Sequence, residues 1–161
     1  MGEPYDAVIA HTVISHVPDY NTFLSAVARS VASNGQVAIF DGDYASITLG
    51  AEKPEDGDVF AGAIINGKIT NPTIMRQLPW LAGDAGLEIA TSFSYLLSEI
   101  GAAQFFADMF PSLPVLLPKS GVADEATVQA WVDQQMRFSN AGRFFGAINF
   151  YTYLLRPMRP N

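Results

Sequence analysis

The sequence predicts an α/β fold with a four-stranded mixed sheet and covering helices, and three features near its start indicate this. Residues 5–12 contain the short apolar run Val8, Ile9 and Ala10, which is typical of a strand buried on both faces. A helical pattern follows, and residues 36–40 then form a second buried strand. A strand, one helix and a strand at this spacing make a right-handed parallel crossover.

The helix of this crossover has a start signal, an apolar stripe and an end signal. Asp19 follows Pro18 and is the expected N-cap. Apolar residues recur at helical spacing at Phe23, Leu24, Val27, Ala28 and Val31. Asn34-Gly35 is expected to end the helix, because glycine tolerates a left-handed conformation. The strand at 36–40 is expected to end in an acidic turn formed by Asp41, Gly42 and Asp43.

The middle of the chain predicts one further helix and a third strand. Residues 54–58 are expected to be a loop, and residues 59–65 are an ambiguous apolar run. Asn71 and Pro72 suit the N-cap and first position of a helix that Gly86 closes. Pro79 lies inside the helical pattern, so we expect a kink or a break there. Residues 87–97 are the third strand.

The last third predicts helices and a final strand. Prolines interrupt the apolar residues 100–121, which indicates one short helix and then an irregular loop. Asp124 is the expected cap of another helix, which ends near Gly142. Residues 145–155 form the last strand, because they are rich in aromatic and β-branched residues. Without a long linker, residues 1–161 are expected to form a single domain.

Composition excludes several classes of protein. The 161 residues are 49% hydrophobic and 16% charged, which is typical of a globular chain with a core. A net charge of −7 with scattered basic residues argues against nucleic acid as a partner. The chain has no cysteine, no apolar run long enough to span a membrane and no secretory signal. The expected location is therefore cytoplasmic, with no membrane partner.

Motifs in the first crossover resemble those of a known family. Tyr5-Asp6-Ala7-Val8, the segment 15–19 (SHVPD) and the turn Asn34-Gly35 follow one another in the order found in the C-terminal half of class I S-adenosylmethionine-dependent methyltransferases. The resemblance implies a partial Rossmann-like methyltransferase fold. Its last two strands would be an antiparallel pair, in the spatial order 5–12, 36–40, 145–155, 87–97.

The resemblance also implies S-adenosylmethionine as the cofactor. Members of the family bind it on a glycine-rich loop after their first strand, and this sequence contains no such G-x-G-x-x-G loop. The family's N-terminal cofactor-binding half is therefore expected to be absent, which leaves open whether the isolated chain binds cofactor. Two hypotheses follow. The chain is an inactive methyltransferase-like fragment that acts as a dimeric binding or structural module. Alternatively, it is a component of a small-molecule methyltransferase that another chain or an N-terminal region completes.

Candidate site residues follow the first two strands, where open α/β sheets bind ligands. By resemblance, the loop with His11, Thr12 and His16 would contact the methionine end of the cofactor. The alternative is that these residues only cap the strand. Asp41, Asp43 and Tyr44 would face the methyl acceptor, where a carboxylate could orient or deprotonate a hydroxyl or amine. The alternative is an ordinary acidic turn.

Other chemistry has weaker support. His11 and His16 with Asp41 and Asp43 match no known metal-ligand spacing, so we expect no metal site. Ser15 is not part of a nucleophile elbow. Aromatic and methionine residues at 105–117 and 144–153 are typical of a core, and any pocket among them would suit a small apolar molecule.

The strand from Tyr5 to Thr12 would have a neighbour on both sides in the complete family fold. An apolar strand edge without a neighbour promotes association. We therefore expect a homodimer in which two copies pair these edges, with Val8, Ile9 and Val13 at or near the interface.

Overall fold

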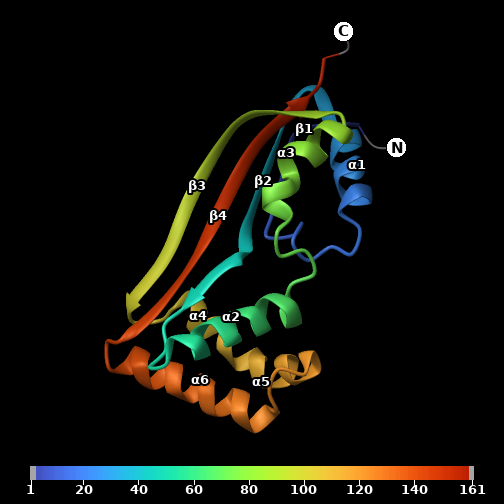
Figure 1. Ribbon diagram of the computed structural model, residues 1–161. Coiled ribbons are helices and arrows are strands. Elements are labelled where there is room, and N and C mark those ends of the chain that lie inside the picture. Colours follow the sequence, from blue (N-terminus) through green and yellow to red (C-terminus); the bar gives the residue numbers. More distant parts are fainter. Residues whose placement is uncertain (1–2, 160–161) are drawn as a thin grey trace. The chain divides into compact units, whose positions relative to one another are not determined.

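The computed structural model describes residues 3–159, and its four strands form one sheet (Figure 1). They are β1 (Tyr5–His11), β2 (Val31–Leu49), β3 (Leu87–Gly101) and β4 (Phe144–Pro157). Their spatial order is β1-β2-β4-β3, which confirms the predicted order with the first strand at one edge. β1 and β2 are parallel, and Figure 1 shows β3 and β4 running in opposite directions, as predicted.

Six α-helices and two short 3-10 helices connect these strands in the described part of the chain. α1 (Tyr20–Ser30) joins β1 to β2, and α2 (Pro54–Lys68) and α3 (Ile74–Asp84) follow β2. A series of short helices lies between β3 and β4: α4 (Phe105–Met109), η1 (Phe110–Ser112), α5 (Leu113–Leu116) and η2 (Leu117–Ser120). The longer α6 (Glu125–Asn140) then leads into β4.

The chain is organised in two compact units. The first contains Met1–Asp43, Thr70–Tyr95 and Phe150–Asn161, and the second contains Tyr44–Ile69 and Leu96–Asn149. β2, β3 and β4 each contribute residues to both units. The assignment of residues 1–161 to a single domain stays a prediction.

The core of the first unit lies between its strands and the helices α1 and α3. α1 begins where predicted, since the Asp19 carboxylate accepts the Thr22 amide at 3.0 Å. Of the apolar stripe predicted for α1, Leu24 and Val27 are buried within the helix, and Val31 is the first residue of β2. The buried core residues are Ala10, Ile14, Leu24, Val27, Val31, Val37, Ile39, Ile74, Met75, Leu78, Ala82, Leu87 and Leu155.

The prediction that the first strand is buried on both faces is wrong. Ala10 is buried and Val8 packs against the core, but Tyr5 and Ile9 are 66% and 75% exposed. Side chains alternate between the two faces of a strand. The two helices of this unit pack on the face that carries Ala10. No described helix of the unit covers the opposite face, so Ile9 stays in solvent.

Asn34-Gly35 does not end the helix, because α1 stops at Ser30 and β2 begins at Val31. Gly35 is extended rather than left-handed, since it is not among the described glycines with positive φ. A Cβ at this position would lie 2.9 Å from the carbonyl oxygens of Tyr5 and Asp6. Glycine is therefore needed here for a close approach to β1, and not for a helix cap.

The predicted acidic turn after Phe40 is also wrong. β2 continues through Asp41, Gly42 and Asp43 to Leu49. Both carboxylates are buried, with 0% and 3% of Asp41 and Asp43 exposed. A turn would have left them in solvent, so their burial requires partners from elsewhere in the fold.

Three expectations for the middle of the chain need correction. The expected loop at 54–58 is the first turn of α2, which has Pro54 at its start and acidic Glu55 and Asp56 beside it. The N-cap of α3 is Thr73 and not Asn71. α3 continues through Pro79 without a break. Gly86, with φ of 80°, lies just beyond the helix as predicted.

The core of the second unit is largely aromatic. Phe60 of α2 stacks on Trp131 of α6, with ring centroids 4.2 Å apart, and Phe110 meets the same indole edge-on. Asp124 caps α6 as predicted, accepting the Thr127 amide at 2.7 Å. The segment 100–121 contains four short helices, where one helix and a loop were predicted.

Candidate functional site

The predicted site begins at the carboxyl end of β1, where an aromatic row crosses three neighbouring strands. The His11 ring lies 4.7 Å from the Phe40 ring of β2, tilted by 30°. Phe40 stacks on Phe150 of β4 at 5.2 Å with nearly parallel planes. His11 pairs with Phe40 in the β1–β2 register, so this row follows from the parallel pairing. The exposed His11 ring is thereby held against an apolar support.

Thr12 continues the chain in a strained conformation. Its φ is 51°, and it is the one non-glycine residue with positive φ among residues 3–159. A β-branched residue in this region costs about 1–3 kcal/mol. The Thr12 amide donates to the Phe40 carbonyl at 2.8 Å, and its hydroxyl donates to the His11 carbonyl at 2.8 Å. These bonds hold the turn that redirects the chain out of β1.

A buried carboxylate fixes the loop beyond Thr12. Asp41 Oδ2 accepts the Ser15 amide at 3.0 Å, and Asp41 Oδ1 accepts the Ser15 hydroxyl at 3.0 Å. Oδ1 also accepts the Gly42 amide at 2.8 Å. Ser15 and Asp41 are both fully buried. Buried polar groups are stable only when they are hydrogen-bonded, and these bonds between Ser15 and Asp41 lock the loop to β2.

Asn71 holds the same loop from the other side. Its side-chain amide donates to the carbonyls of Val17 at 2.6 Å and Ile14 at 3.3 Å, and its backbone amide donates to the Ser15 carbonyl at 2.8 Å. Asn71, which was expected to cap α3, therefore holds the loop at 12–17 in place. Two distant segments, at Asp41 and at Asn71, thus fix the position of this loop.

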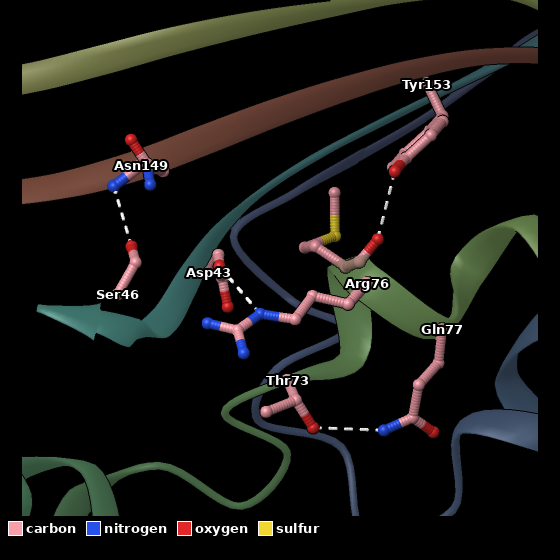
Figure 2. Close-up of polar contacts among 8 residues, drawn as sticks. Asp43, Ser46, Thr73, Arg76, Gln77, Asn149 and Tyr153 are labelled. Carbon is pink, nitrogen blue, oxygen red and sulfur yellow. Dashed lines mark hydrogen bonds and ion pairs between the residues drawn. The ribbon is translucent and has the colours of Figure 1, made fainter.

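Asp43 lies two residues after Asp41 on β2, and its carboxylate pairs with Arg76 of α3 (Figure 2). The Arg76 Nε donates to Asp43 Oδ2 at 2.9 Å, and the side chains are 51% and 4% exposed respectively. The same view shows Tyr153 of β4, whose hydroxyl donates to the Met75 carbonyl at 3.0 Å. The Asp43 carboxylate is therefore already engaged by a cation from α3.

Removing Arg76 tests this pairing. Arg76→Ala is expected to destabilise the fold by about 1–2 kcal/mol, because the buried Asp43 carboxylate would lose its guanidinium. This expected loss of stability is smaller than for a fully buried ion pair, because half of the Arg76 side chain is in solvent. Urea unfolding measures the difference. Gln77→Ala on the same helix is the matched control. Equal stability of the two variants would contradict a stabilising role for the pair.

The ionisation of Tyr153 provides a spectroscopic test of the packing around Asp43 and Tyr153. Burial raises the pKa of Tyr153 above its ordinary value of 10.0, and the nearby Tyr151 and Asp43 raise it further. Because the pKa of Tyr153 is higher in the folded chain than in the unfolded chain, its protonated hydroxyl contributes fully to stability at pH values below the unfolded-state pKa. This contribution is lost as the pH rises through the folded-state pKa.

We therefore expect Tyr153 to become tyrosinate later than an ordinary tyrosine in an alkaline titration. The difference in ultraviolet absorbance between the wild type and Tyr153→Phe isolates this residue from the other tyrosines. An ordinary midpoint in that difference curve would contradict the burial seen here.

The structure brings some of the predicted site residues together and separates others. His11 and Thr12 lie at the carboxyl end of β1, where both contact Phe40 of β2, and the next residue of β2, Asp41, holds the same loop through Ser15. His16 is exposed on the following loop, where its amide donates to the Val13 carbonyl at 2.9 Å. Tyr44 is buried and belongs to the second compact unit.

Sequence reasoning missed Arg76, which pairs with Asp43, and Tyr153, which bonds to the Met75 carbonyl. Arg76 is a single basic residue in an amphipathic helix, and Tyr153 is one of several aromatic residues in a strand, so no local pattern distinguishes either. The structure also holds no group of three or more histidine or acidic residues suited to a metal ion within residues 3–159. None of the described helices is both long and apolar enough to cross a membrane.

Comparison with known proteins supports the fold. No family model and no curated protein sequence matches the chain. Among solved structures, it is similar to a candidate methyltransferase from Bacillus halodurans, with a TM-score of 0.59 and 14% identity over 98% of this chain and 71% of that one.

Two further solved structures give lower scores. One is a candidate sarcosine dimethylglycine methyltransferase from Galdieria sulphuraria, with a TM-score of 0.44 and 15% identity over 96% of this chain and 54% of that one. The other is a cyclopropane synthase from Mycobacterium tuberculosis, with a TM-score of 0.48 and 12% identity over 96% and 56%. The chain thus spans between about half and seven-tenths of these proteins.

At 14% identity, the likeness to the Bacillus halodurans protein establishes the architecture and not the activity. The chain therefore has an α/β, Rossmann-like fold of the methyltransferase type, as the sequence motifs predicted.

Proposed function

We propose that the chain is a component of an S-adenosylmethionine-dependent methyltransferase that acts on a small molecule. The observation that carries this proposal is the fixed loop at 12–17. Asp41 and Asn71 hold it at the carboxyl end of β1, and the carboxyl ends of parallel strands are where open α/β sheets bind their ligands. A strained Thr12 at the start of this loop supports a functional role, since such strain persists where a fold over-determines it.

The residues at this edge fit the polar end of the cofactor. His11 and His16 are exposed, so their rings are accessible to a ligand, and Thr12 is half-buried. When bound, S-adenosylmethionine supplies an activated methyl group. His11, Thr12 and His16 would bind its methionine end. Asp43, held by Arg76, would orient the acceptor's hydroxyl or amine.

Other polypeptide would complete the site, from a second chain or from an N-terminal region. β1 is an edge strand, and Tyr5 and Ile9 project from the face that no described helix of its unit covers. An exposed apolar edge and face favour the addition of further strands and helices. These would carry the glycine-rich loop that residues 1–161 lack.

A second candidate function is a non-catalytic homodimeric module. The observation that favours it is that both buried carboxylates already have partners: Asp41 is bonded to Ser15 and Gly42, and Asp43 to Arg76. Neither is poised as a general base. Two copies would pair their edges from Tyr5 to Thr12, with Ile9 near the contact.

One experiment separates the candidates. The chain is purified alone and together with the polypeptide encoded directly upstream of it. Methyl transfer from S-adenosylmethionine is then assayed with small amines and alcohols, and molecular mass is measured by analytical ultracentrifugation.

The methyltransferase proposal predicts transfer only by the combined sample, and an upstream sequence with a glycine-rich strand–loop–helix. A stable dimer of the chain alone, with no transfer in either sample, would favour the second candidate. A monomer at micromolar concentration would count against that dimer.

A further inference from the structure

A polar hollow of about 220 Å³ lies in the first unit, away from the candidate site. Its walls come from residues 33–36 of β2, from Arg156 and Pro157 at the end of β4, and from Arg159 just beyond that strand. His11 and Thr12 lie at the carboxyl end of β1, whereas residues 33–36 lie at the opposite end of the parallel pair. We propose that this hollow binds a small oxyanion, a role that does not depend on methyl transfer.

One wall of the hollow is shaped by an irregularity in the sheet. Tyr5 of β1 pairs with Val31, but Ala7 pairs with Gln36, so β2 has extra residues between these two pairings. A bulge of this kind projects residues out of the ladder. Gly35 fixes its path, because any side chain there would collide with the carbonyl oxygens of Tyr5 and Asp6. The wall is therefore preformed.

Two guanidinium groups line the opposite wall. Arg156 Nε donates to Glu88 Oε1 at 2.6 Å, which orients the side chain and leaves its terminal nitrogens without a protein partner in the described chain. Arg159 forms no side-chain hydrogen bond or ion pair with any residue between 3 and 159. A guanidinium presents a planar fork of donors that suits carboxylate and phosphate groups.

The remaining lining adds neutral hydrogen-bonding groups. Ser33, Asn34 and Gln36 contribute a hydroxyl and two amides, and none of these side chains bonds to another described residue. The chain as a whole carries a net charge of −7, which repels anions. Two of its nine basic residues line this one polar hollow, so the hollow is positively charged although the chain is acidic. A small oxyanion is the ligand that all of these donors can bind.

The test is a titration of the ¹⁵N-labelled chain followed by NMR. Potassium phosphate is added in one arm and sodium acetate in another, each against potassium chloride at equal ionic strength. The amides of Asn34, Gly35 and Gln36 are expected to shift saturably. Arg159→Gln should weaken binding about tenfold. This variant is expected to fold normally, because Arg159 contacts no described partner. Arg29→Gln, an exposed arginine of α1, is the matched control and should bind as the wild type does.

Saturation by phosphate alone would identify a phosphate-binding hollow, and saturation by acetate as well would identify one that also accepts carboxylates. Either result supports the proposal. Shifts that do not exceed those with chloride, or equal affinity of Arg159→Gln and the wild type, would overturn it.

Discussion

Gly57→Ala is expected to destabilise the protein by about 2–4 kcal/mol, although alanine is the better helix former. Gly57 lies in the first half of α2, and a Cβ on it would lie 2.2 Å from the Leu49 carbonyl oxygen. That oxygen belongs to the backbone at the end of β2, so no side-chain rotation relieves the overlap. Either α2 or the end of the strand must move.

Gly62→Ala provides a matched control in the same helix. A Cβ at Gly62 meets no atom within 4 Å. Alanine there should stabilise the protein by about 0.5–1 kcal/mol, because it restricts the unfolded chain more than glycine does. Urea unfolding of both variants measures the two effects. Equal stability of Gly57→Ala and Gly62→Ala would contradict the close approach of α2 to the Leu49 carbonyl oxygen.

Asp41→Ala is expected to cost about 2–4 kcal/mol. The carboxylate accepts the Ser15 amide, the Ser15 hydroxyl and the Gly42 amide. All of these donors lie in a buried environment, so removing their acceptor leaves each without a partner and without water. The loop at 12–17 should also loosen, which faster amide hydrogen exchange at Ser15 would reveal.

Two variants control for this effect. Ser15→Ala removes one donor and leaves two bonds to Asp41, so it should cost about 1 kcal/mol. Asp58→Asn changes an exposed carboxylate on α2 and should be nearly neutral. If Asp41→Ala lost no more stability than Asp58→Asn, the result would contradict the role of Asp41 in holding the loop against β2.

Local signals predicted the elements whose cause is itself local. Asp19 and Asp124 cap their helices through bonds to residues three positions later, a contact that the sequence shows directly. The strand order came from the resemblance of the motifs around Tyr5 and Asn34-Gly35 to a known fold. α2 could have been found too, since Pro54, Glu55 and Asp56 are helix-start residues.

The errors concern residues whose role depends on distant partners. Asn34-Gly35 resembles a helix end, but Gly35 is required by the carbonyls of β1. Asp41-Gly42-Asp43 resembles a turn, but the fold buries both carboxylates. Asp41 is bonded to Ser15, 26 residues away, and Asp43 to Arg76, 33 residues away. No local pattern in the sequence predicts such long-range pairs.

We propose that the loop after β1 binds the methionine end of S-adenosylmethionine. Calorimetric titration with S-adenosylhomocysteine, with the chain and its upstream polypeptide combined, measures this binding. His11 and His16 are both exposed, so replacing both by alanine should leave the fold intact. The proposal predicts micromolar binding by the wild type and binding at least about tenfold weaker by the double variant. No binding by the wild type at millimolar ligand, or equal binding by both proteins, would contradict it.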